Sequence, residues 1–213
     1  MTQHIPFAHL RRLLLAAFIV AAAPIAHAAS LSGAALVDAL RHGGYVLVMR
    51  HASSPFAAPD KSTANPDNPK LERQLDEAGR STARTMGEAI RHLRIPVGDV
   101  LSSPTYRALE AVRIAALGQP KTYAELDEGA QGMQSGADPR KSAWLRAKAA
   151  ERPRAGSNTF IVTHTPNIVD AFGQDAGRIA AGEALVFHPD AKGGTELVAR
   201  IKIEEWPQLE GAK

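Results

Sequence analysis

The chain has 213 residues, with 25 Lys and Arg against 22 Asp and Glu, and it contains no cysteine. The lack of cysteine excludes thiol catalysis, cysteine-based metal sites and disulfides, so packing alone must hold the fold together. At this length a single domain is the default expectation.

The N-terminus has the three parts of a secretory signal peptide. Arg11 and Arg12 precede the apolar run "LLLAAFIVAAA" at 13–23, and a small-x-small stretch ends at Ala28. A membrane-spanning helix needs about 20 apolar residues, and this run is shorter. We therefore expect no stable membrane insertion. We expect cleavage near Ala28, which makes 1–28 the signal peptide and 29–213 the domain of a periplasmic or secreted protein.

Cleavage would also change the charge. Residues 1–28 carry two arginines and no acidic residue, so their removal lowers the formal charge from +3 to +1. A nearly neutral chain gives no reason to expect a nucleic-acid partner.

The predicted elements then alternate along the chain. The first half has a helix at 31–41, a strand at 45–49, a long loop at 52–70, a helix at 75–93 and a strand at 99–103. A helix at 103–117 with Ser103 as N-cap, a strand at 121–123, a loop at 127–137 and a helix at 138–151 follow. The chain continues with a strand at 159–163, a helix at 165–173 capped by Thr165, and strands at 183–188 and 196–203.

The strands are continuous apolar runs rather than alternating ones. Such strands are typical of a mainly parallel sheet that is covered by helices on both faces. The predicted fold class is therefore a three-layer α/β fold, and ligands bind such sheets at the carboxyl ends of the strands.

Three groups of polar residues fall at those strand ends. Arg50 and His51 follow the first strand, "SSPTYR" with Arg107 follows the second, and His164 follows the strand at 159–163. The helix N-termini at 103 and 165 favour anions. Two Arg, two His and no set of metal ligands predict a phosphate-binding site, and we expect neither a metal nor another cofactor.

Phosphoryl transfer at such a site needs a nucleophile and an acid. Arg guanidinium groups match the phosphoryl oxygens and stay charged. Nearby Arg charges keep a histidine neutral, so one His can attack phosphorus while the other donates hydrogen bonds. A carboxylic acid is then needed to protonate the leaving alcohol.

The set "MRHA", "SSPTYRALEAVRIA" and "VTHTPN" resembles the histidine phosphatase superfamily, which includes the cofactor-dependent phosphoglycerate mutases. The resemblance spans about 44–203, with Ala52 in place of the glycine of the Arg-His-Gly signature. It implies that His51 is the phosphorylated histidine. It also implies a phosphate clamp of Arg50, Arg107 and His164.

The same resemblance suggests the remaining site residues. "LDEGAQG" at 126–132 fits the spacing of one branch and makes Glu128 the implied acid, with Glu125 and Asp127 as alternatives. The segment "ERQLDEAGR" at 72–80 is similar to one that borders the site in bacterial members, which implies that Arg73 binds substrate.

The expected function is an exported, metal-independent phosphomonoesterase that acts on a small phosphorylated substrate through a phosphohistidine. Two alternatives stay open, a phosphoglycerate mutase-type phosphotransferase and a catalytically silent phosphosugar-binding domain. The sequence carries no signal for an oligomeric state.

Overall fold

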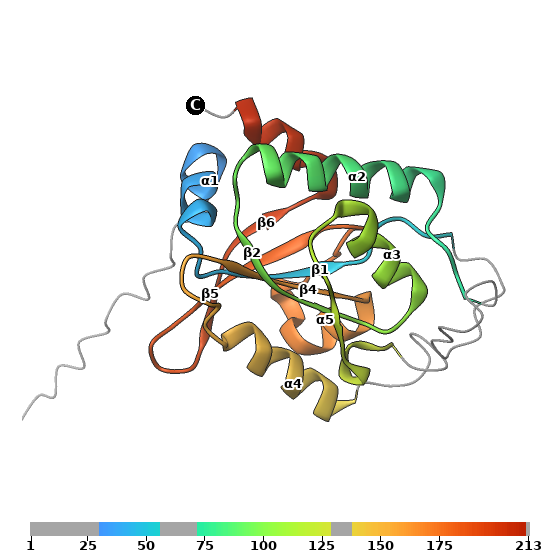
Figure 1. Cartoon of the computed structure of the whole chain (residues 1–213). Helices are drawn as coiled ribbons and strands as arrows, with labels where there is room; N and C mark the ends of the chain where they lie inside the picture. The colour runs from blue at the N-terminus through green and yellow to red at the C-terminus, as the bar shows by residue number, and fades with distance from the viewer. Residues whose placement is uncertain (1–29, 56–71, 129–137, 212–213) are drawn as a thin grey trace, which may run out of the picture.

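The computed structural model describes residues 30–55, 72–128 and 138–211 (Figure 1). The predicted signal peptide and most of the loops predicted at 52–70 and 127–137 lie outside these residues. In the ranges that are described, no helix has the length and apolar character needed to cross a membrane.

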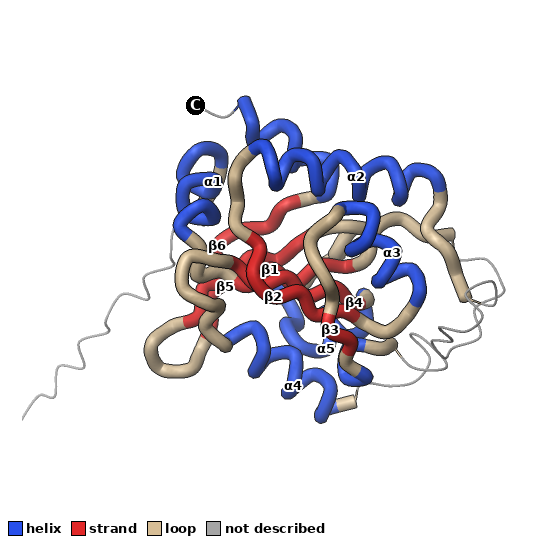
Figure 2. Tube along the Cα trace, in the orientation of Figure 1, coloured by secondary structure: helices blue, strands red, loops and turns tan. Residues whose placement is uncertain are grey.

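One six-stranded sheet, in the order β3-β2-β4-β1-β5-β6, forms the middle layer (Figure 2). Strand β5 is antiparallel to β1 and to β6, and β1, β2, β3 and β4 run parallel. The mainly parallel sheet predicted from the sequence is therefore confirmed. The strands are β1 (Val46–Arg50), β2 (Val97–Ser102), β3 (Lys121–Thr122), β4 (Asn158–Thr163), β5 (Ala184–Pro189) and β6 (Thr195–Ile201).

Helices cover both faces of the sheet, as predicted (Figure 1). One face carries α1 (Gly33–His42), α2 (Glu77–His92), α3 (Tyr106–Ala115) and the 3-10 helix η5 (Ile203–Gly211). The other carries α4 (Pro139–Ala150) and α5 (Thr165–Phe172). The short 3-10 helix η2 (Ala124–Leu126) contacts α4, and η4 (Gly173–Asp175) contacts α5.

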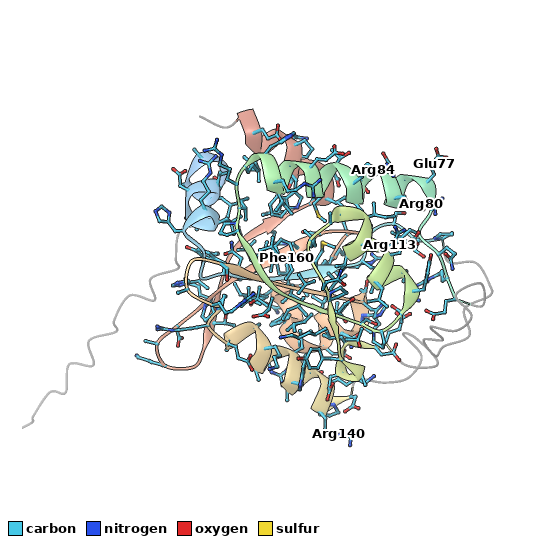
Figure 3. The ribbon with its side chains drawn as sticks, viewed as in Figure 1. Glu77, Arg80, Arg84, Arg113, Arg140 and Phe160 are labelled. Atoms are coloured by element: carbon cyan, nitrogen blue, oxygen red, sulfur yellow. The ribbon has the colours of Figure 1, made fainter. Side chains whose placement is uncertain are left out.

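The central strand β1 shows why its sequence is apolar throughout. Leu47 and Met49 lie in the core beneath α1, α2 and α3, whereas Val46 and Val48 lie in the core beneath α4 and α5. All four are fully buried. Because side chains alternate between the faces of a strand, a sheet covered on both sides needs apolar residues at every position. Phe160 of β4 fills the middle of the first core (Figure 3).

Both predicted helix caps near the site are wrong. Helix α3 has Thr105 as its N-cap rather than Ser103, because the Ser103 backbone N–H still donates to Val162 of β4 (2.9 Å) and so belongs to the extended chain. Helix α5 has His164 as its N-cap rather than Thr165, which is already its first helical residue. Ser103 and His164 therefore lie just past the ends of the adjacent strands β2 and β4, before their helices begin.

Candidate active site

The sheet order brings the predicted site residues together. Strands β2, β4 and β1 are neighbours and run parallel, so their carboxyl ends form one edge. Arg50 pairs with Thr163 across the β1–β4 ladder, and the His51 backbone N–H donates to the Thr163 carbonyl (3.0 Å). His51 and His164, far apart in the sequence, therefore lie with their ring centroids 5.2 Å apart.

His51 is buried, with only 3% of its surface exposed. Its Nδ1 lies 2.7 Å from the carbonyl oxygen of Ala52. Because a carbonyl only accepts hydrogen bonds, Nδ1 must carry the proton, which leaves the lone pair of the neutral ring on Nε2. Burial, followed by the charge of Arg107, lowers the pKa of His51 to about 3. At neutral pH the ring is therefore uncharged and nucleophilic at Nε2.

The backbone after His51 is held against the start of α2. Ser53 donates through Oγ to Asp76 (2.7 Å), and its carbonyl accepts from the Asp76 backbone N–H (3.2 Å). A Cβ on Gly79 would stand 2.1 Å from that carbonyl, so only glycine permits this approach. Among the described residues, Ala52 does not have the positive φ that favours glycine. An alanine therefore fits where the family signature has glycine.

His164 is fully buried beside His51. Its Nε2 lies 2.9 Å from Oγ of Ser103 and 3.3 Å from Oγ1 of Thr105. Its Nδ1 lies 3.5 Å from a carboxylate oxygen of Glu128. Burial first, and then the neighbouring His51 and Arg107, hold the pKa of His164 well below its ordinary value.

Three arginines, Arg50, Arg73 and Arg107, surround the two rings and are here called the arginine cluster. Arg107 is in the first turn of α3 and is 1% exposed. Arg50 ends β1 and donates to the Ile179 carbonyl (3.2 Å). Its pKa is lowered by burial and by the charge of Arg73. Each arginine adds a positive charge near the imidazoles.

Glu128 joins these groups. One carboxylate oxygen hydrogen-bonds to Arg107 and lies 3.7 Å from Arg73, and the other faces His164. Of the three carboxylates considered from the sequence, it is the one that reaches the arginines and His164 within the described chain. Arg50, His51, Arg73, Arg107, Glu128 and His164 therefore form one cluster.

Several residues of the site were missed from the sequence. The carboxylate of Glu72, which is 4% exposed, accepts the backbone N–H of Tyr106 (2.6 Å) at the first position of α3. It thereby anchors the turn that carries Arg107. Ser103 and Thr105, which bond His164, were missed because Ser103 was interpreted as a helix cap. In the sequence, the one sign that Glu72 belongs to the site is its position directly before Arg73.

The described part of the chain holds no group of three or more His, Asp or Glu side chains arranged to bind a metal ion. The cluster combines positive guanidinium groups, two imidazoles and one carboxylate. Guanidinium forks and neutral imidazole N–H groups are donors that match phosphoryl oxygens. The arrangement can bind a tetrahedral oxyanion and present Nε2 of His51 to it.

Comparison with known protein families shows to which family the chain belongs. A family model described as the histidine phosphatase superfamily (branch 1) matches residues 46–168. The chain belongs to the histidine phosphatase superfamily. The matched range contains all six residues of the cluster, so the resemblance of the three motifs is confirmed at the level of the superfamily.

Solved structures support the same fold. The protein histidine phosphatase SixA, solved with tungstate, aligns with 18% identity and a TM-score of 0.56, covering 76% of this chain and 98% of its own. A phosphoserine phosphatase variant from Entamoeba histolytica, solved with phosphoserine, aligns with 12% identity and a TM-score of 0.50, covering 75% and 98%. Among curated proteins, none matches the chain significantly in sequence. At these identities the structural likeness shows the fold alone.

Proposed function

We propose that the chain is an exported, metal-independent phosphomonoesterase that works through a phosphohistidine at His51. The observation that carries this proposal is the state of His51. Its Nδ1 faces a carbonyl and its pKa is lowered to about 3, so a neutral Nε2 lone pair stands beside the arginine cluster. A neutral imidazole is a nucleophile that needs no separate base.

In the first half-reaction, Nε2 of His51 forms a bond to phosphorus while the ester P–O bond breaks. The electron pair of that bond goes to the leaving oxygen, which takes a proton from Glu128. Arg50, Arg107 and His164 hold the phosphoryl oxygens, where negative charge is spread in the transition state.

In the second half-reaction, water attacks the phosphohistidine. A P–O bond forms, the P–N bond breaks and its electron pair returns to Nε2 of His51. The Glu128 carboxylate takes the proton that the water loses, so the enzyme regains its starting state.

The proton from Glu128 matters most for poor leaving groups. The negative charge of a bound phosphomonoester favours the protonated carboxyl over the carboxylate. An alkoxide is a poor leaving group and needs this proton, whereas p-nitrophenolate leaves without it. Dependence on the leaving group is therefore the signature of the acid.

Two other functions fit the same superfamily. A phosphoglycerate mutase would transfer the phosphoryl group from His51 back to substrate, and the expected export argues against it because its substrate is cytoplasmic. A silent phosphosugar-binding domain would keep the cluster without turnover. The contact of Glu128 with His164 and Arg107 favours catalysis over silent binding.

The proposal is tested with purified protein and a panel of phosphomonoesters in excess EDTA. The panel includes sugar phosphates, phosphoserine, a phosphohistidine peptide and phosphoglycerate. We expect turnover that EDTA leaves intact and that vanadate or tungstate inhibits, and we expect no turnover and no acid-labile phosphoenzyme in His51→Ala. Activity lost with EDTA and restored by zinc or magnesium would contradict the proposal, and isomerised phosphoglycerate would favour the mutase.

Export is a separate part of the proposal, supported by the charge and apolar pattern of residues 1–28. Mass spectrometry of protein recovered from the envelope or medium should find a mature N-terminus at or near Ala29. A full-length chain retained in the cytoplasm would overturn this part and leave the proposed chemistry untouched.

A further inference from the structure

Residues 124–128, here called the acid segment, carry Glu128 into the site. The segment consists of η2 and the two residues that follow it. Within it, the backbone N–H groups of Leu126 and Asp127 donate to the carbonyls of Tyr123 (3.1 Å) and Ala124 (3.1 Å). The carbonyls of Glu125, Leu126 and Asp127 accept hydrogen bonds from side chains of other elements.

Three side chains supply those donors. Thr163 of β4 donates to the Leu126 carbonyl (2.7 Å), and Lys141 of α4 donates to the Asp127 carbonyl (2.6 Å). Asn167 of α5 donates from one amide nitrogen to the carbonyls of both Glu125 (3.2 Å) and Asp127 (3.3 Å). Asn167 is thus the only one of the three that bridges two carbonyls of the acid segment.

The side chain of Asn167 is buried where it bonds the acid segment. It is 7% exposed, and within the described residues its Oδ1 has no hydrogen-bond partner. A buried amide with an unsatisfied oxygen is destabilising unless its other contacts compensate. The side chain donates its hydrogen bonds to the acid segment, so that segment explains its place in the core.

The same residues also set the position of His164. Thr163 precedes His164 and Asn167 follows it by three residues, in the first turn of α5. The "VTHTPN" motif therefore places one imidazole and, through two neighbouring side chains, the segment that ends in Glu128. The 3.5 Å contact between His164 and Glu128 depends on both.

The geometry points to Asn167 as a positioning residue, which holds the carboxyl of Glu128 between His164 and Arg107. The inference rests on the proposed function, because it assigns Asn167 to the step in which the leaving oxygen is protonated. Asn167 acts through the backbone of the acid segment, because its side-chain amide donates to the carbonyls of Glu125 and Asp127.

Two consequences follow from a misplaced Glu128. The proton would reach the leaving oxygen less well, which affects alkyl phosphates but not p-nitrophenyl phosphate. The carboxylate would also be less well held against Arg107 and Arg73, where it now opposes any incoming anion, so inorganic phosphate should bind more tightly. The second consequence can be measured without turnover.

The test compares Asn167→Leu, of similar size but without an N–H donor, with Glu128→Gln. For Glu128→Gln we expect a rate loss of about 10²–10⁴-fold on an alkyl phosphate and little loss on p-nitrophenyl phosphate. Asn167→Leu should show the same selectivity with a loss of about 10–10²-fold on the alkyl phosphate, since small misplacements cost that much. The double variant should be no slower than Glu128→Gln alone.

Calorimetry with inorganic phosphate is the second measurement. Glu128→Gln should bind phosphate about tenfold more tightly than the wild type, and Asn167→Leu should move in the same direction. Lys141→Met, which removes a donor at the edge of the segment, should give a smaller effect of the same kind. The matched control is Lys148→Met on the same helix, whose amine bonds Glu151 (2.7 Å), and it should change nothing.

The outcomes separate the two proposals. Equal rate losses on both substrates, with wild-type phosphate affinity, would make Asn167 a packing residue and overturn the inference while the proposed function stands. A wild type without turnover overturns the proposed function, and the phosphate affinities of Asn167→Leu and Glu128→Gln still decide whether Asn167 positions Glu128. A wild type that does not bind phosphate would overturn both.

Discussion

The protonation state of His51 is set by two causes that act together. Burial removes the water that would stabilise the imidazolium, and the guanidinium of Arg107 is the strongest of the nearby charges that oppose it. Arg107 can exert this effect because it is itself buried at the start of α3 and held in place there. An arginine that we propose to bind phosphate thus also helps to keep the proposed nucleophile neutral.

Removing the charge of Arg107 should raise the pKa of His51. In Arg107→Met we expect the pKa to rise from about 3 but to stay below the ordinary value of about 6.5, because burial is the larger cause. Arg107→Lys keeps the charge and should leave the pKa low, although it loses the guanidinium fork that matches phosphate. NMR titration of the imidazole signals between about pH 4 and 7 measures the difference.

In that titration the wild type and Arg107→Lys should show a flat His51 signal, and Arg107→Met should show the start of a protonation curve at the acid end. A flat signal in all three proteins would mean that burial alone keeps the ring neutral. Arg107 would then act only on the phosphate.

At the scale of elements, continuous apolar runs were sufficient to predict the fold. Every long strand and helix of the sheet layers was predicted, because burial on both faces leaves an apolar pattern that local sequence records. The caps of α3 and α5 were wrong for a reason outside local sequence. Ser103 can cap a helix by its chemistry, but its backbone is bonded to β4, a strand more than fifty residues later.

Long-range contacts account for the other missed features. The 3-10 helix η5 was not predicted, since "EEWPQLEG" has no clear apolar period, yet its Trp206 is fully buried beneath α1 and α2. Glu72 was passed over because its role depends on the N–H of Tyr106, which tertiary folding alone brings near. Arg50, His51, Arg107 and His164 were predicted from their places at strand ends, and Glu128 was predicted from the motif resemblance. The distances between these residues came only from the structure.

For the molecule as a whole, the site places two uncharged imidazoles in the core. His51 has a pKa of about 3, and that of His164 lies well below its ordinary value, both mainly because of burial. In the unfolded chain each histidine has a pKa of about 6.5. Below that pH the unfolded state binds protons that the folded state does not, so the free energy of unfolding falls as the pH falls.

We expect this contribution to be fully present above about pH 6.5. Below it, each of the two histidines lowers the free energy of unfolding by about 1.4 kcal/mol per pH unit, until the pH reaches its folded-state pKa. His51→Asn cannot titrate, so it should remove about that much from the slope measured between about pH 6 and 4 by urea denaturation. His42→Asn is the matched control, because His42 is exposed on α1. If His51→Asn and wild type had equal slopes, the pKa of His51 would not be lowered in the folded protein, and burial and Arg107 would not be what keeps the proposed nucleophile neutral.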